Sequence, residues 1–186
     1  MTAEEIYQKY RSTLKKTSLD RSQNRNESMS DDVSIPVYNY DEVVQEYSIR
    51  EHISKPCSND ALYIDENRIT FIEFKNGGID KEQLKKKVYD SVLVLFDSDM
   101  GLEWCRSDFI GNISFSRKNI DFILVWEDPA CNPKYASKKR IHHHLNRLAE
   151  LGLARLKRYI YKNVQIMSKA EFQHRFVDQV KKNGCA

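Results

Sequence analysis

The sequence predicts an α/β protein in which a mixed β-sheet is flanked by helices. Three observations carry this prediction: two β-rich runs joined by a tight turn at 61–75, an amphipathic helix pattern at 81–96, and a continuous apolar run at 120–126. Short apolar runs of this kind are typical of strands that are buried on both faces. The chain has 186 residues, 40% of them hydrophobic, which is enough for one domain with its own core.

The first 40 residues are expected to stand apart from that domain. Residues 1–16 can form an N-terminal helix. From Thr17 to Asp32 the chain is rich in Ser, Asn, Arg and Asp, so we expect 17–40 to be a flexible linker or loop. The domain itself is expected at 41–182, and its first helix, near 40–53, has apolar residues at helical spacing.

A β-hairpin is predicted next, with strands at 61–65 and 68–75. Glu66 and Asn67 form the two-residue loop that tight hairpins prefer, and asparagine tolerates the positive φ that such turns need. Both faces of the hairpin are mainly apolar, so we expect other elements to cover both. The face sets are Leu62, Ile64, Ile69 and Phe71 on one side, and Ala61, Tyr63, Ile72 and Phe74 on the other.

Charged side chains converge at one end of this hairpin. In the predicted register Asp60 faces Glu73, and Lys75 lies on the same face as Glu73 because side chains alternate along a strand. Two carboxylates suit a hard cation such as Mg²⁺ or Mn²⁺, and the lysine would orient a water and stabilise charge on a phosphate. The alternative is structural: Asp60 caps the strand, and Glu73 and Lys75 form an ordinary ion pair.

The helix at 81–96 begins with an N-cap at Asp80 and has Gln83 at its third position. Gln83 and Lys87 start near the charged strand end, so we expect both to contact nucleic acid. The run 120–126 predicts a buried strand, and 113–115 predicts a smaller one.

The C-terminal part is the most basic. Between 134 and 162 there are nine Lys and Arg residues and one acid, Glu150. This pattern is typical of a phosphate-backbone footprint, and the alternative is a solvated basic helix. A strand is predicted at 159–167, and a capping box of Ser168 and Glu171 opens a last helix. The expected phosphate contacts in this part are Lys138, Lys139, Arg140 and Arg147.

Asp60, followed after twelve residues by Glu73-Phe74-Lys75 and then Asn76-Gly77, resembles the motif of the PD-(D/E)xK nuclease superfamily. The similarity extends over 41–126. It implies a restriction-endonuclease-like core of helix, three strands, helix and strand. It also implies Asp60 and Glu73 as metal ligands, the Phe74 carbonyl as a third ligand, and Lys75 as the catalytic lysine.

Two further points concern this resemblance. Asn59, and not proline, precedes Asp60. Members of the superfamily often add an acidic ligand from the preceding helix, and of Glu42, Glu46 and Glu51 we choose Glu46.

The function expected from these residues is Mg²⁺- or Mn²⁺-dependent hydrolysis of phosphodiester bonds in nucleic acid, with DNA expected ahead of RNA. A homodimer would be natural if both strands of a duplex are cut, and a protein partner could supply specificity. The alternatives are a non-catalytic nucleic-acid-binding or protein-interaction module with a nuclease-like fold, and a hydrolase of small nucleotides. No apolar run predicts a membrane span or a secretory signal, so we expect a cytoplasmic protein. The four scattered cysteines argue against a zinc site or a disulfide framework.

Overall fold

The structure is a computed structural model that describes residues 2–20, 27–65, 68–97, 114–127 and 147–184. Its centre is a mixed six-stranded sheet flanked by helices, as predicted. The first three pairs of neighbouring strands are antiparallel, and the last two pairs are parallel. In spatial order the strands are β1 (Arg11–Thr13), β4 (Pro36–Asn39), β5 (Ala61–Asp65), β6 (Arg68–Asn76), β7 (Ile120–Glu127) and β8 (Asn163–Met167).

The predicted hairpin is confirmed in its register and in its faces. Leu62 pairs with Phe71, and Ile64 pairs with Ile69. The two predicted sets of apolar side chains lie in two separate clusters, one on each side of the sheet. Because both faces are apolar, burial alone does not choose between this register and one shifted by a residue, and in a hairpin the loop length fixes the register.

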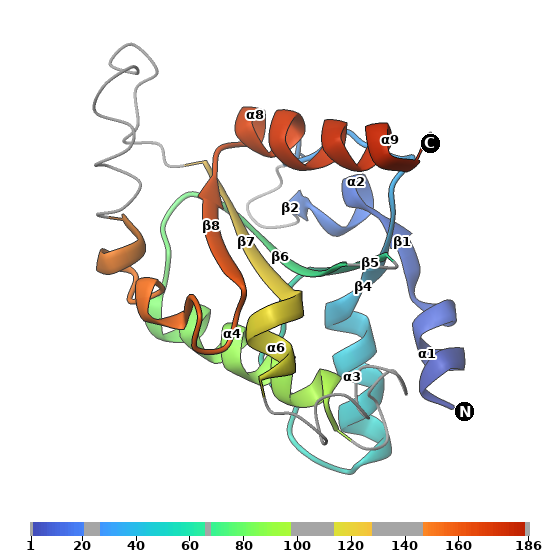
Figure 1. The fold of residues 1–186 in the computed structure, drawn as a ribbon. Coiled ribbons are helices and arrows are strands. Elements are labelled where there is room, and N and C mark those ends of the chain that lie inside the picture. Colours follow the sequence, from blue (N-terminus) through green and yellow to red (C-terminus); the bar gives the residue numbers. More distant parts are fainter. Residues whose placement is uncertain (1, 21–26, 66–67, 98–113, 128–146, 185–186) are drawn as a thin grey trace.

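Helices cover both faces of the sheet (Figure 1). One face carries the larger apolar cluster, to which Ile6, Val43, Val88 and Phe115 contribute. The helices over that face are α1 (Ala3–Lys9), α3 (Tyr40–Arg50), α4 (Lys81–Leu95) and α6 (Phe115–Asn119), together with a 3₁₀ turn, η3 (Ala154–Leu156).

The opposite face is covered from both ends of the chain. Leu14 joins Phe172 and Phe176 in the second apolar cluster. The elements on this side are α2 (Leu14–Thr17), α8 (Lys169–Phe172), a π-helical turn, η4 (Gln173–Val177), and α9 (Asp178–Gly184). A two-stranded sheet of β2 (Leu19–Asp20) and β3 (Glu27–Ser28) lies apart from the main sheet.

The helix starts follow the predicted capping residues. Asp80 accepts hydrogen bonds from the backbone N–H groups of Glu82 and Gln83, and α4 begins directly after it. Ser168 and Glu171 form the predicted capping box at the start of α8. Both caps satisfy N–H groups that have no partner inside the helix.

Three expectations are corrected. Residues 1–16 form two helices separated by β1 rather than one helix. The described part of 17–40 is no linker, because it contributes β2, β3 and β4, and Val37 is buried in the sheet. Phe115 begins α6 instead of ending a small strand, while Ile113 lies outside the described residues. The N-terminal part therefore belongs to the same sheet as the expected domain.

The order of elements also differs from the one that the resemblance implied. Among the described residues two strands, β5 and β6, lie between α3 and α4, not three. The remaining neighbour of β5 is β4, which precedes α3 in the chain. In the part of the chain that the structure describes, no helix combines the length and the apolar character needed to cross a membrane.

Candidate active site

The candidate site lies where β5 begins, beside β6 and under α4. Asp60 directly precedes β5, and Glu73 and Lys75 lie near the end of β6. Glu73 and Lys75 share the face of β6 that α4 covers, because Phe71, two residues before Glu73, lies in the same cluster as Leu84 and Val88. Lys87 reaches the site from α4.

Two ammonium groups surround the Glu73 carboxylate, whose side chain is fully buried. Lys87 Nζ donates to Glu73 Oε1 and Oε2 at 2.8 and 3.0 Å. Lys75 Nζ lies 3.1 Å from Glu73 Oε1. Lys87 Nζ also lies 3.4 Å from Asp60 Oδ1. The structure thus brings the predicted Asp60, Glu73 and Lys75 together and adds Lys87 to them.

Backbone hydrogen bonds hold Asp60 in place. Its Oδ2 accepts from the N–H of Phe74 at 2.7 Å, and its carbonyl accepts from the N–H of Tyr40 at the start of α3. The preceding residue, Asn59, donates its N–H to Ser91 Oγ at 2.9 Å. Proline has no N–H to donate, so this bond gives a physical reason why a residue other than proline stands before Asp60.

The electrostatics reflect burial of these opposite charges. Burial raises the pKa of Glu73 to about 7, and the nearby Asp60 carboxylate adds to the shift, although both lysines oppose it. Burial also raises the pKa of Asp60, against the opposing effect of Lys87 and the Phe74 N–H. Burial would lower the pKa of Lys87, but its two carboxylate partners raise it by more. Burial of a carboxylate costs free energy unless nearby cations compensate its charge, and the raised pKa values reflect that cost.

The oxygen atoms at the site fit a hard divalent cation. Asp60 Oδ1 and both Glu73 oxygens lie within hydrogen-bonding distance of one ammonium, so a single cation could contact them. The Phe74 carbonyl points to the same side of β6 as its N–H, which faces Asp60. No group of three or more His, Cys, Asp or Glu side chains suited to a metal occurs among the described residues. Two carboxylates, a carbonyl and waters match the requirements of Mg²⁺.

Glu46 does not lie at the site, which corrects its selection as a metal ligand. Its carboxylate pairs with Lys9 Nζ at 2.8 Å and accepts from the Tyr10 hydroxyl at 2.6 Å. It therefore fastens α3 to the N-terminal helix. The helical acid near the site is instead Asp41, whose Oδ1 accepts from Ser58 Oγ at 2.7 Å.

Asp41 was missed because the apolar spacing of α3 shows which face of the helix is buried but not which end of it lies at the site. Its own position, second in the helix, is a local signal, since acids are favoured in the first turn. Burial acts to raise the pKa of the Asp41 carboxyl, but the hydrogen bonds from Lys55 and Ser58 lower it by more. The charge of Lys87 also lowers it, which connects Asp41 to the same centre.

Apart from Arg147, the residues predicted to contact nucleic acid fall into three groups. Lys87 lies in the centre itself. Gln83 is exposed one turn earlier on α4, and no described contact joins it to Asp60 or Glu73. Lys138, Lys139 and Arg140 lie outside the described residues.

Arg147 contacts Trp126, which in turn lies next to Lys75 of the centre. Trp126 is the β7 neighbour of Lys75, and its indole N–H donates to the Gly77 carbonyl at 2.7 Å. The Arg147 guanidinium stacks over the indole, 4.4 Å from the ring centroid. A second cationic side chain is thereby placed at the end of the sheet where Lys75 lies.

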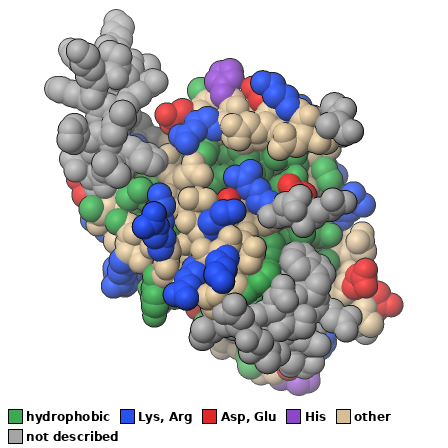
Figure 2. Space-filling view, in the orientation of Figure 1, with side chains coloured by type: hydrophobic (Ala, Val, Ile, Leu, Met, Phe, Trp, Pro, Cys, Tyr) green, Lys and Arg blue, Asp and Glu red, His purple; other side chains and the backbone are tan. Residues whose placement is uncertain are grey.

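Other basic side chains continue from Arg147 along the sheet. The segment 147–162 runs back to the start of β7, where the Lys162 N–H donates to the Ile120 carbonyl. Figure 2 shows Lys and Arg side chains gathered over α4 and this segment. Within the described ranges no ion pair neutralises its exposed members Arg155, Lys157, Arg158 and Lys162.

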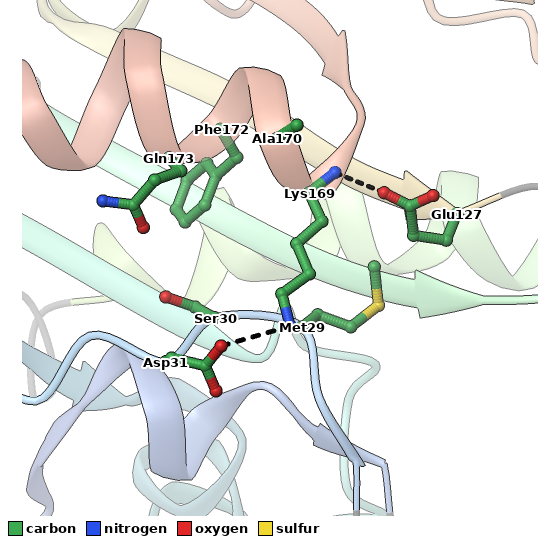
Figure 3. A pocket seen from close by; sticks show the side chains of 8 residues that line it. All are labelled: Met29, Ser30, Asp31, Glu127, Lys169, Ala170, Phe172 and Gln173. Carbon is green, nitrogen blue, oxygen red and sulfur yellow. Dashed lines mark hydrogen bonds and ion pairs between the residues drawn. The ribbon is translucent and has the colours of Figure 1, made fainter. Parts of the chain in front are cut away.

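An open pocket of about 520 Å³ lies elsewhere, between the loop after β3 and α8 (Figure 3). Its polar groups are paired with one another: Lys169 contacts Asp31 with its ammonium, and its backbone N–H donates to Glu127. Phe172 and Met29 line it from the second apolar cluster. The pocket is therefore on the face of the sheet opposite to Glu73.

Comparisons with known proteins give no further identification. No protein-family model matches the chain, and neither the curated proteins nor the solved structures include a significant match.

Proposed function

We propose that this chain is a Mg²⁺- or Mn²⁺-dependent endonuclease that hydrolyses phosphodiester bonds of nucleic acid, with DNA expected ahead of RNA. We further propose that its core is restriction-endonuclease-like. The observation that carries the proposal is that Asp60, directly before β5, and Glu73, on the neighbouring β6, lie close together and that the ammonium group of Lys75 contacts Glu73. The 2.7 Å bond from the Phe74 N–H holds Asp60 for this role.

Each residue of the centre has a distinct role in the proposed reaction. Asp60, Glu73 and the Phe74 carbonyl would hold the cation, which supplies a more acidic water and neutralises charge on the phosphate. Lys75, whose side chain is one quarter exposed (26%), can reach both the buried carboxylate and an incoming substrate. It would orient the attacking water and stabilise the negative charge that develops in the transition state.

The basic segment 147–162 supports a polymeric substrate. Its exposed cations provide contacts to successive phosphates, which give affinity that depends on salt and little on sequence. A hydrolase of small nucleotides would have no use for cations spread along the sheet.

The test is cleavage of labelled single-stranded and duplex DNA and RNA by the purified chain in Mg²⁺, Mn²⁺ or EDTA. We expect metal-dependent cutting, and a loss on the order of 100-fold or more in Glu73→Gln and in Lys75→Ala, because each removes a group that acts on the reacting atoms. The preferred substrate would define the class of nucleic acid.

Two matched controls make this test specific. Glu46→Gln removes the same charge as Glu73→Gln, but at the contact with Lys9 and Tyr10. Lys85→Ala removes a lysine that pairs with the exposed Glu82 on α4. Both should cut like the wild type. Full cleavage by both Glu73→Gln and Lys75→Ala would refute the assignment.

One observation favours a second candidate function, a non-catalytic nucleic-acid-binding or protein-interaction module with a nuclease-like fold. Lys87 bonds to both Asp60 and Glu73, so the cluster is also a self-neutralising ion-pair network. Such a network can be purely structural. Divalent-cation binding that is lost in Asp60→Ala distinguishes the two functions, because a scaffold has no reason to show it.

A further inference from the structure

Lys87 contacts both carboxylates of the candidate active site. Its Nζ lies 2.8 and 3.0 Å from the two Glu73 oxygens and 3.4 Å from Asp60 Oδ1. Its side chain is only 13% exposed. An ammonium group has three N–H donors, and these three oxygens match that number. Lys87 therefore uses its full hydrogen-bonding capacity on the two carboxylates.

These are the same oxygens that the proposed function assigns to a divalent cation. Mg²⁺ takes its oxygen ligands at about 2.0–2.1 Å and demands nearly regular geometry. An ammonium at hydrogen-bonding distance from Asp60 and Glu73 stands where such an ion would have to lie. The two cations cannot hold these oxygens at the same time.

We propose that Lys87 competes with the divalent cation for Asp60 and Glu73, so that the cation binds only when the Lys87 ammonium moves away. This inference rests on the proposed function. A lysine suits such an exchange because its charge is carried on a flexible four-carbon stem. Its backbone stays in the middle of α4, where the neighbouring Val88 is buried.

Lys75 differs from Lys87 in this respect. It approaches one oxygen of Glu73, at 3.1 Å, from the same strand. Among the described ion pairs none joins Lys75 to Asp60. A cation held by Asp60 and Glu73 therefore leaves Lys75 in place, whereas it must displace Lys87. Comparing substitutions of Lys87 and Lys75 therefore distinguishes direct competition for the carboxylates from the general repulsion between positive charges.

The experiment is a Mn²⁺ titration of the full chain without nucleic acid, followed by the electron paramagnetic resonance signal of the free ion. We expect Lys87→Gln to bind Mn²⁺ at least about tenfold more tightly than the wild type, within the range usual for coupled binding. Lys75→Gln should gain only about two- to threefold, from reduced repulsion. Lys85→Gln, on the same helix, should match the wild type. Adding Glu73→Gln to Lys87→Gln should remove the tight binding.

The outcomes separate this inference from the proposed function. If Lys87→Gln binds Mn²⁺ no more tightly than the wild type or than Lys75→Gln, while Glu73→Gln abolishes binding, competition is refuted and the metal centre stands. If neither the wild type nor Lys87→Gln binds Mn²⁺, both are refuted. Thermal unfolding with and without Mn²⁺ checks the fold, and Lys87→Met provides a second uncharged variant if Lys87→Gln unfolds.

Discussion

Glu73 is the residue that most strongly constrains the candidate site. Its carboxylate is fully buried, and the side chains that precede it on the same face of β6, Ile69 and Phe71, are apolar. Burial of a charge costs free energy, and the adjacent Asp60 increases that cost. Lys87 and Lys75 compensate part of it. The burial of Glu73 therefore lowers the stability of the fold, and a buried group with a shifted pKa of this kind is a candidate for a functional role.

The raised pKa of Glu73 leads to a prediction about stability and pH. Because the pKa is about 7 in the folded state and near 4.5 in the unfolded state, the folded chain binds more protons between these values. Its stability must then fall as pH rises through this window. In EDTA we expect the free energy of unfolding to fall by about 1–3 kcal/mol more in the wild type than in Glu73→Gln between pH 4.5 and 7.

Urea denaturation at several pH values measures this difference. Glu46→Gln serves as the control, since the pKa of Glu46 is lowered by its hydrogen bonds to Lys9 and Tyr10. Its stability profile should run parallel to that of the wild type above pH 4.5. Parallel profiles for wild type and Glu73→Gln would show that the Glu73 carboxyl keeps an ordinary pKa.

At the scale of elements, the last helices are fastened to the N-terminal half by one buried acid. Asp32, 3% exposed, pairs with Lys181 of α9. The same carboxylate accepts from the N–H groups of Ser34 and Ile35 at 3.0 and 2.8 Å. These partners lower the pKa of Asp32 although burial acts to raise it. The loop before β4 and the end of the chain are therefore coupled.

We predict that Asp32→Ala lowers the free energy of unfolding by about 1–3 kcal/mol, because it leaves the buried Ile35 N–H unpaired and removes the Asp32 partner of Lys181. Its neighbour Asp31 is a matched control. Asp31 is 75% exposed and lies 3.4 Å from Lys169, so Asp31→Ala should cost less than about 0.5 kcal/mol. Urea denaturation of both variants decides the matter, and equal losses would contradict the anchoring role.

The helices and strands that could be predicted from the sequence are those whose residues carry a local signal, such as alternation, a turn or a helix cap. The hairpin of β5 and β6 follows from alternation and a two-residue loop, and α4 follows from its cap at Asp80 and its apolar spacing. The strands β1 and β4 could not be predicted in the same way. They have three and four residues, too few to show a period. They form because β5 offers its edge to β4, and β4 in turn pairs with β1.

The same distinction applies to the site. Asp60, Glu73 and Lys75 could be predicted because one hairpin register brings them together. Lys87 was expected only near the strand end, and its bonds to both carboxylates depend on how α4 packs over β6. Glu46 was wrong because several acids on α3 fit the helical pattern equally well. Long-range packing instead places Asp41, at the start of that helix, beside Ser58 and within the electrostatic influence of Lys87.

At the scale of the whole molecule, the candidate site and the basic segment lie on the same face of the sheet. The face with α4 carries Glu73 and its lysines, and the cationic segment 147–162 packs against the same face through Leu148, Leu153 and Leu156. The other face is closed by α8 and α9 (Figure 1). A polymer that reaches the candidate site is therefore expected to lie along the first face.

Arg147 provides the test of this arrangement, because it connects the basic segment to the centre through Trp126. We predict that Arg147→Ala weakens binding of duplex DNA. It should also make the negative slope of log K against log salt less steep by about 0.9, which corresponds to the loss of one phosphate contact. The matched control is Arg175→Ala. Arg175 is exposed on the π-helical turn over the opposite face and bonds to Gln165 at 3.2 Å, so its removal should leave the slope unchanged.

Fluorescence anisotropy in EDTA, over a series of salt concentrations, measures both variants without cleavage. An equal change of slope in the two would mean that the nucleic acid responds to net charge alone. An unchanged slope in Arg147→Ala would indicate that the nucleic acid does not bind beside Trp126, and therefore not beside Lys75. A selective effect of Arg147 would place the polymer at the end of β6 where Asp60 and Glu73 meet, since Trp126 is the direct neighbour of Lys75 in the sheet.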